Sequence, residues 1–367
     1  MVLLLLFVLA WFSGFILFRK ARLDYHGQRQ IDHSRVSVII PARNEEGNLP
    51  YLLGSLQKQT FRPHEIIVVD DFSSDGTREI ARKYGAKVIE SIRLPDGWTG
   101  KNWALWNGYL QSSGDILVFL DADVRLAPGA LEALLQARER STGAISVVPY
   151  HITEKFYEKL SLLTYLLGVF VFTSPFEKNR SRKGLYGSCI VAAREDYEQI
   201  NGHSSVKSEV LDDMKLGMKF SEAGIPIQNF IGGNLVFFRM YPYGLVNQFL
   251  GLSKSAVFGA ANTHPATLVL IGAWVLGLLL TGFLMPILMM ISHSLFMPIL
   301  IAYILYAVQI CYFLKYTGKY GWVMPILHFL STLFFVLVII HSVYQVVFLG
   351  RVSWKGRQID LGGREVL

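Results

Sequence analysis

The chain has 367 residues, 52% of them hydrophobic, and a formal net charge of +7. Its first 222 residues carry 27 basic and 26 acidic side chains, whereas no acidic residue occurs between Glu222 and Asp360. The basic excess therefore lies in the apolar half. This argues against nucleic-acid binding, which favours a basic stripe on the polar part. Two distant cysteines, Cys189 and Cys311, exclude a disulfide framework and a thiolate metal site.

The amino-terminal run, residues 1–18, is almost wholly apolar, and Arg19, Lys20 and Arg22 follow it. A secretory signal carries its positive charge before the apolar run and a small-residue cleavage site after it. The order found here favours a retained transmembrane anchor over a cleaved peptide, with the carboxyl side of the anchor in the cytoplasm. Eighteen residues are near the lower limit for a span.

From residue 35 the sequence alternates between short apolar runs and amphipathic segments. The apolar runs predict strands over residues 36–40, 65–69, 86–90, 116–120, 144–150, 184–193 and 235–240. The amphipathic segments predict helices over residues 48–59, 77–84, 101–111, 128–139 and 212–223. Strand–helix alternation at this rhythm predicts an α/β fold with a doubly wound, mostly parallel sheet.

Four longer apolar stretches suggest a membrane. Residues 156–172 begin with charged side chains, which favours a helix in the membrane interface or a core helix over a span. Residues 267–291, 295–314 and 323–349 are each long enough to cross a bilayer.

The orientation of the last stretch raises a conflict. If the polar domain and the loop with Lys315 and Lys319 are cytoplasmic, a single crossing puts Arg351 and Arg357 outside. That contradicts the tendency of basic residues to stay inside. Either the last stretch re-enters or crosses twice, or the rule fails here, and the sequence leaves this open.

Polar clusters directly follow three of the predicted strands, at residues 41–46, 70–77 and 121–123. The carboxyl ends of parallel strands lie along one edge of a doubly wound sheet, where ligands bind. Any single cluster is explained by a turn: Asn44 and Asp75 are good helix caps, and Asp121 with Asp123 alone suits a solvated turn. Three acid-rich loops on one edge are harder to explain as turns alone. They predict a site for Mg²⁺ or Mn²⁺ with a diphosphate.

Four segments carry a resemblance to a known family: VSVIIPARNEE, IIVVDDFSSDGT, GWTGKNWALWNG and DILVFLDADV. In order and spacing they resemble the family-2 glycosyltransferases with the GT-A fold, and the resemblance covers residues 35–245. Three further segments lie outside the catalytic motifs: VVPYHITEKFYEKLS, FRMYPYG and WKGRQ. They resemble the bacterial subfamily that glycosylates C30 carotenoid acids in staphyloxanthin-type synthesis.

The resemblance implies roles for individual residues. Those that would bind the nucleotide sugar are Pro41, Ala42, Asn44, Glu45, Asp71, Lys101 and Asp121. Among them, Asp71 would contact the uracil ring and Lys101 would lie near the diphosphate. Asp121 and Asp123 would hold the ribose and the divalent cation.

The family also carries an acidic pair on a later helix, and Asp212 and Asp213 occupy that place. We expect Asp213, in preference to Asp212, to deprotonate the acceptor. Acids in the first turn of a helix are, however, also stabilised by the helix dipole. A carboxylic acid acceptor is already ionised near neutral pH, which makes a base less necessary. Cys189 is expected to pack rather than react, because inverting transfer needs no enzyme nucleophile.

The processive members' Gln-x-x-Arg-Trp motif is missing from this sequence, which favours a single sugar transfer. In the corresponding region, Arg239 would contact the diphosphate or extend to the membrane interface. His151 and His203 are expected to be structural, with His151 the better candidate for acceptor contact.

The expected function is a membrane-bound inverting glycosyltransferase. It would transfer a hexose, glucose from UDP-glucose, to a lipophilic acceptor in the bilayer, the carboxylate of a C30 carotenoid acid (4,4'-diaponeurosporenoate). The alternatives are a hopanoid, diacylglycerol or polyprenyl-phosphate acceptor, and more remotely a transporter or non-enzymatic membrane protein. The sequence leaves the oligomeric state open.

The expected organisation is a multi-pass protein of the cell membrane with a cytoplasmic catalytic domain. Its parts are an anchor at 1–18, the catalytic domain at 35–245, an interface segment at 246–265, transmembrane helices at 266–350 and a basic tail at 351–367.

Overall fold

A computed structural model describes residues 2–25, 27, 35–91, 93–177, 183–291, 293–354 and 357–360. Met1 of the expected anchor and residues 355, 356 and 361–367 of the expected tail lie outside these ranges. The chain forms two compact units. The α/β unit comprises Ala21–Tyr150 and Asn179–Arg239, and the helical unit comprises Met1–Lys20, His151–Lys178 and Met240–Leu367.

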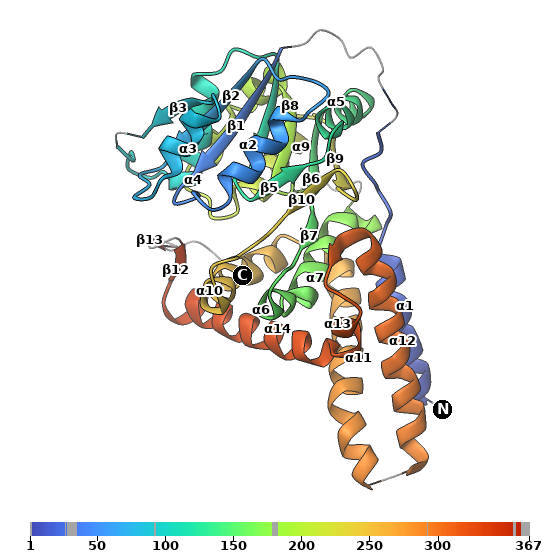
Figure 1. Cartoon of the computed structure of the whole chain (residues 1–367). Coiled ribbons are helices and arrows are strands. Elements are labelled where there is room, and N and C mark those ends of the chain that lie inside the picture. Colours follow the sequence, from blue (N-terminus) through green and yellow to red (C-terminus); the bar gives the residue numbers. More distant parts are fainter. Residues whose placement is uncertain are drawn as a thin grey trace. The chain divides into compact units, whose positions relative to one another are not determined.

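A seven-stranded sheet forms the centre of the α/β unit (Figure 1). Its strands are β1 (Val36–Ala42), β2 (Glu65–Asp70), β3 (Lys87–Glu90), β4 (Ile116–Leu120), β6 (Ala144–Val148), β8 (Cys189–Ala193) and β9 (Ile227–Ile231). They lie in the order β3-β2-β1-β4-β8-β6-β9. β8 is antiparallel to β4 and β6, and the other pairs are parallel. This confirms the predicted doubly wound, mostly parallel sheet.

The helices of this unit are α2 (Leu49–Gln57), α3 (Thr77–Lys83), α4 (Gly100–Leu110), α5 (Ala130–Ser141), α8 (Arg194–Gln199) and α9 (Asp212–Glu222). One face of the sheet, with Ile39 and Phe119, packs against α4, α8 and α9 in a single apolar cluster. α4 approaches β1 so closely that a Cβ on Gly108 would lie 2.4 Å from Ile39. A short antiparallel pair, β5 (Val124–Leu126) and β10 (Val236–Phe238), follows the end of β4.

The strand predicted over residues 184–193 is shorter in the structure. The expected strand 184–193 contributes only Cys189–Ala193 to the sheet. The preceding residues pack against α9 instead, where a Cβ on Gly184 would lie 2.3 Å from Met214 and one on Gly187 would lie 2.7 Å from Asp213. The small residues that resemble a strand pattern thus serve close packing near α9.

The helical unit contains α1 (Val2–Leu17), α6 (Phe156–Lys159), α7 (Leu162–Thr173), α10 (Leu245–Ala261), α11 (Pro265–Ile291), α12 (His293–Thr317), α13 (Val323–Ile326) and α14 (His328–Val343). A single π turn, Tyr344–Phe348, extends α14, and the hairpin β12 (Arg351–Trp354) and β13 (Arg357–Asp360) follows. In the same unit, β11 (Gly318–Lys319) pairs with His151 and Ile152 of β7 (Tyr150–Ile152).

Four of the helical segments in the described residues are long and apolar enough to cross a membrane: Phe156–Thr173, Pro265–Leu288, Phe296–Thr317 and His328–Phe348. The first is interrupted between α6 and α7 and is 56% buried, as a core helix would be. α1, the expected anchor, has 16 residues and is shorter than these four. The expected stretch 323–349 is divided at Leu327 into α13 and α14.

Candidate active site

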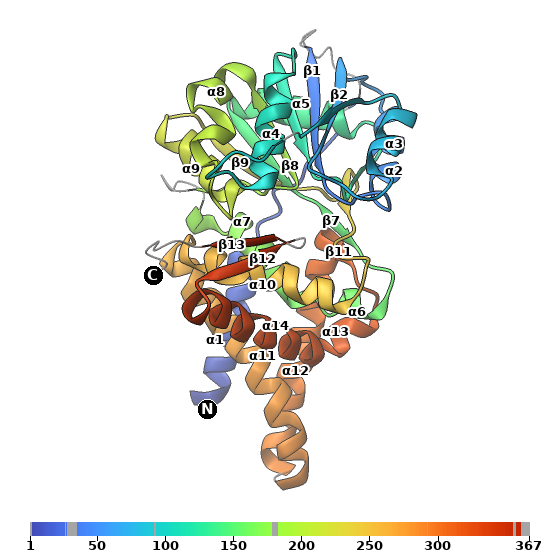
Figure 2. The same ribbon diagram turned by 90° about the vertical axis from the view of Figure 1, so that its left-hand side faces the viewer.

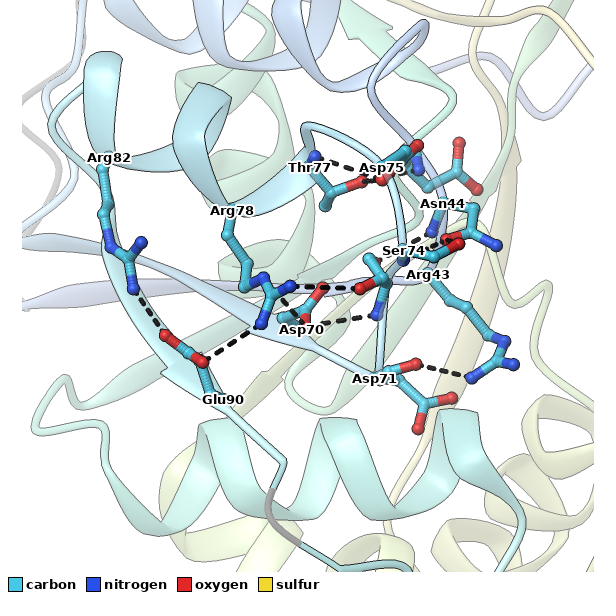
Figure 3. Close-up of polar contacts among 12 residues, drawn as sticks. Arg43, Asn44, Asp70, Asp71, Ser74, Asp75, Thr77, Arg78, Arg82 and Glu90 are labelled. Atoms are coloured by element: carbon cyan, nitrogen blue, oxygen red, sulfur yellow. Dashed lines mark hydrogen bonds and ion pairs between the residues drawn. The ribbon is translucent and has the colours of Figure 1, made fainter.

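The loops after β1 and β2 are bound to each other by hydrogen bonds (Figure 3). Asn44 has φ +52°, a left-handed conformation that asparagine tolerates. Its N–H donates to Ser73 Oγ at 2.9 Å, and its Oδ1 accepts the N–H of Ser74 at 2.9 Å. The N–H of Glu45 donates to Thr77 Oγ1 at 2.8 Å. Asn44 and Glu45 thus hold together the two loops that the sequence assigns to the nucleotide.

The neighbouring strand register places Pro41 opposite Val69 and Ala42 opposite Asp70. Asp71 lies at the same edge, since its N–H donates to Ala42 O at 2.8 Å and its carbonyl accepts from Arg43 Nη1 at 2.8 Å (Figure 3). Asp70 has a structural role, because its buried carboxylate accepts the N–H of Ser73 at 3.3 Å. Of the two acids, Asp71 remains the candidate for contact with the uracil ring.

Lys101 lies in the first turn of α4 and is paired with the first acid of the D-x-D motif. Its Nζ is 2.9 Å from Asp121 Oδ1, and the two side chains are 21% and 28% exposed. Burial alone would lower the pKa of Lys101, but Asp121, followed by Asp212 and Asp213, raises this pKa above its usual value. The ammonium therefore stays charged and faces carboxylates from two separate motifs.

The second acidic pair opens α9, with Asp212 buried and Asp213 partly exposed. Burial, and next the charge of Asp212, raises the pKa of Asp213 to about 6. Asp213 Oδ1 accepts the N–H of Met214 at 2.9 Å, and the carboxylate packs against the backbone of Gly187. The structure thus brings the predicted catalytic acids into the electrostatic surroundings of Lys101.

Sequence reasoning missed Asn102, which is completely buried in the first turn of α4. Its Nδ2 donates to the carbonyl oxygens of Val206, Lys207 and Glu209 at 2.8, 3.2 and 3.3 Å. These carbonyls belong to the segment that leads into α9. The side chain therefore fixes the helix of Lys101 relative to the helix of the acidic pair. Its position after Lys101 in GKN was visible, but its distant acceptors were not.

β8 and the residue before it position Asp121. Asp121 donates its N–H to Ser188 O at 3.0 Å, and Leu120 pairs with Cys189. Burial raises the pKa of the Cys189 thiol, so this residue packs as expected. His203 is also buried, with Nδ1 2.7 Å from the Tyr197 hydroxyl, which fits the structural role expected for it.

His151, the expected alternative acceptor contact, lies in the helical unit. Its side chain is 1% exposed, and Nδ1 lies 2.6 Å from the Tyr320 hydroxyl. This contact ties β7 to the residue that follows β11, which is a structural role.

Asp123 completes the candidate cation site, and its carbonyl accepts the N–H of Arg239 at 3.4 Å. Within the described part of the chain, no group of three or more His, Cys, Asp or Glu side chains could hold a metal ion. Asp121 and Asp123 supply two carboxylates, which are hard oxygen donors. The donor set fits Mg²⁺ or Mn²⁺ if diphosphate oxygens and water complete the coordination.

The parallel strand edge and its acidic cluster are consistent with a glycosyltransferase, and the comparisons agree. Residues 37–200 match the family model described as glycosyl transferase family 2. The chain is 35% identical over 369 residues to a 4,4'-diaponeurosporenoate glycosyltransferase of Staphylococcus haemolyticus (strain JCSC1435), covering 96% of each. It belongs to glycosyl transferase family 2 and is a glycosyltransferase.

Two further matches are consistent with this assignment. A 4,4'-diaponeurosporenoate glycosyltransferase of Staphylococcus aureus (strain MRSA252) is 32% identical over 337 residues, or 90% of this chain and 89% of the relative. Among solved structures, the mannosyltransferase PcManGT from Pyrobaculum calidifontis, in complex with GDP-Man and Mn²⁺, has a TM-score of 0.54 at 16% identity. That match covers 93% of this chain and 95% of the other and confirms the GT-A type of fold.

Proposed function

We propose that this chain is a membrane-bound, inverting, non-processive hexosyltransferase. It transfers glucose from UDP-glucose to the carboxylate of a C30 carotenoid acid, 4,4'-diaponeurosporenoate. The observation that carries the chemistry is the position of Lys101. Its ammonium lies 2.9 Å from Asp121, and the negative charges of Asp212 and Asp213 also act on it. The acceptor is supported by the names of relatives at 31–35% identity over at least 90% of the chain.

In this proposal the joined loops after β1 and β2 hold the nucleoside of the donor. Pro41, Ala42, Asn44 and Glu45 line the pocket, and Asp71 accepts a hydrogen bond from the uracil ring. Hydrogen bonds already fix both loops, so little conformational entropy is lost when the nucleoside binds.

The diphosphate lies between Lys101 and the D-x-D motif. A divalent cation held by Asp121 and Asp123 would neutralise the diphosphate as it becomes the leaving group. Lys101 contributes a second positive charge, which Asp121 holds in position before the donor arrives. A charge fixed in advance stabilises a developing anion without reorganisation during the reaction.

Asp213 faces the acceptor side in this scheme. A carboxylic acid acceptor has no proton to lose near neutral pH, so Asp213 has no proton to remove in that reaction. A hydroxyl acceptor, such as a hopanoid or diacylglycerol, needs a base. The raised pKa of Asp213, about 6, suits a general base near neutral pH. This observation supports the hydroxyl-lipid transferase as the second candidate.

The apolar helices of the helical unit hold the enzyme in the cell membrane, with the catalytic unit in the cytoplasm. Four segments are long and apolar enough to span, and basic residues flank the apolar runs. A carotenoid acid dissolves in the bilayer, so membrane attachment places the enzyme beside its acceptor. Transfer of one sugar is favoured because the sequence lacks the processive Gln-x-x-Arg-Trp motif.

The test is incubation of membranes that contain the enzyme with labelled UDP-glucose and 4,4'-diaponeurosporenoic acid, or with a hydroxyl lipid. We expect labelled carotenoid ester, with loss of product after EDTA treatment and recovery with Mg²⁺ or Mn²⁺. Asp123→Ala should lose activity, whereas Asp115→Asn, an exposed acid paired with Arg35 away from the site, should keep it. Product with the hydroxyl lipid alone would refute the carotenoid acceptor, and an active Asp123→Ala variant would refute the D-x-D role.

A further inference from the structure

The outer face of α14 and of the π turn that extends it is a continuous apolar stripe. Large hydrophobic side chains that are between 43% and 61% exposed recur every three or four residues: Phe329, Leu333, Leu337, Ile340, Tyr344 and Val347. This spacing places them on one side of a helix. Soluble proteins rarely expose a contiguous apolar surface of this kind.

The opposite face of the same helix is polar and buried. His328, Ser331, Thr332, Ser342 and Gln345 are each at most 7% exposed. Between them, Phe334 and Val338 pack against Leu252 of α10, and Ser342 Oγ accepts the N–H of Val257 at 3.2 Å. The helix thus turns its polar side to the protein and its apolar side outward. That arrangement is stable when the outward side of the helix contacts lipid.

The direction of α14 differs from that of the other long helices of its unit. α11 and α12 run beside each other as a long antiparallel hairpin, and α14 runs across them in both views (Figures 1 and 2). With its π turn, His328–Phe348 spans 21 residues, or about 31 Å, which would suffice to cross a bilayer. Length therefore does not decide between a span and an interfacial helix, whereas direction does.

We infer that α14 lies in the plane of one membrane leaflet, with its apolar stripe in the lipid, and does not cross the membrane. The inference rests on the proposed membrane attachment. The partner is a bilayer surface: the stripe is continuous along the helix, and the same unit carries the α11–α12 hairpin, which is itself exposed and apolar at Phe283 and Val308. Only α11 and α12 then cross the membrane after the α/β unit.

This placement resolves the charge conflict in the sequence. Lys315 and Lys319 precede α14, and Arg351 and Arg357 follow it. If α14 does not cross, all four basic residues lie on one side of the membrane, as the positive-inside tendency requires. Trp322, 76% exposed just before α13, has the amphipathic ring that favours the membrane interface.

The first test is labelling with a membrane-impermeant maleimide in intact cells and in inverted vesicles. Single cysteines are introduced in a Cys311→Ala background as Lys319→Cys, Gln358→Cys and Met290→Cys; the remaining Cys189 is fully buried, and the parent is the unlabelled control. Met290 lies near the far end of α11 and is 89% exposed. We expect positions 319 and 358 to label from one side and position 290 from the other.

The outcomes separate the two proposals. If position 358 labels with position 290, α14 crosses and the inference is overturned. If positions 319 and 290 label from the same side, the α11–α12 hairpin does not cross and the proposed membrane attachment itself is wrong.

A second measurement reports depth in the bilayer and does not depend on which side of the membrane a residue faces. Nitroxide labels on Leu333→Cys, Leu337→Cys and Val347→Cys report depth through their accessibility to oxygen and to a water-soluble nickel chelate. An in-plane helix gives similar depths at all three positions. A spanning helix gives depths that differ by about 21 Å between positions 333 and 347, from 1.5 Å rise per residue, and that result would overturn the inference.

Discussion

Replacing Lys101 by methionine removes an ammonium that lies among acidic residues of the site and keeps most of its aliphatic stem. Lys101 Nζ and Asp121 Oδ1 are 2.9 Å apart, which corresponds to about 6 kcal/mol of attraction at an effective dielectric constant of 20. Because the two side chains are 21% and 28% exposed, solvent screens part of that attraction. We expect the free energy of unfolding to fall by about 1–3 kcal/mol, less than for a fully buried pair.

The effect on catalysis should be larger than the effect on folding. If Lys101 stabilises the departing diphosphate, Lys101→Met should lower kcat/KM by about 10² to 10³-fold, the usual effect of removing one fixed group that stabilises charge. Binding of UDP should weaken, whereas binding of uridine should stay unchanged because uridine has no phosphate. Lys101→Arg, which keeps the charge, should recover part of the activity.

The assay is sugar transfer from labelled UDP-glucose by the detergent-solubilised full chain, with calorimetry for UDP and uridine and thermal unfolding as the folding control. A Lys101→Met variant that keeps kcat/KM within threefold would show that the ammonium is a structural partner of Asp121 alone. Equal weakening of UDP and uridine would show that the substitution disturbs the whole pocket.

Three further predictions concern the neighbours of this cluster. The pKa of Asp213, raised by burial to about 6, means that the folded state binds more protons than the unfolded state. The stability that this carboxyl contributes should therefore be fully present below about pH 4 and be lost, by up to about 3 kcal/mol, as pH rises through 6; urea titrations of Asp213→Asn should lack this slope. Asn102→Ala should lower the free energy of unfolding by about 2–4 kcal/mol, because three carbonyls lose a buried donor, and lower kcat more than it changes donor KM; an unchanged kcat in the folded variant would contradict its positioning role. Gly187→Ala would place a Cβ 2.7 Å from Asp213 Oδ2, so kcat should fall at least tenfold while the unfolding temperature changes by only a few degrees, and a normal kcat would mean that the carboxylate position is not critical.

The edge of the sheet that carries the polar clusters could be predicted because its signals are local. The runs of β1, β2 and β4 are almost continuously apolar, which is typical of strands covered on both faces. Each ends directly in a polar cluster, and parallel pairing then brings those clusters to one edge. The sequence thus sufficed to place Asn44, Asp71 and Asp121 at one edge of the sheet.

The remaining contacts depend on partners far apart in the chain, which periodicity does not encode. β8 enters the sheet antiparallel to β4 and brings Gly187 to Asp213. Asn102 binds carbonyls more than a hundred residues away. The packing of Phe334 and Val338 of α14 against Leu252 of α10 likewise joins residues far apart in the chain.

The charge of the site explains why its groups occur together. Asp121, Asp123, Asp212 and Asp213 are four carboxylates from two motifs, and the charges of Asp121, Asp212 and Asp213 act on the ammonium of Lys101. A nucleotide sugar adds further negative charge on its diphosphate, so binding is favourable only if additional positive charge enters with it. The donor is therefore expected to bind as a complex with a divalent cation, while the raised pKa of Asp213 allows this acid to share a proton when the cation is absent. The cation, Lys101 and Asp213 therefore belong to one charge balance. Removing the cation or replacing Lys101 should change the pKa of Asp213.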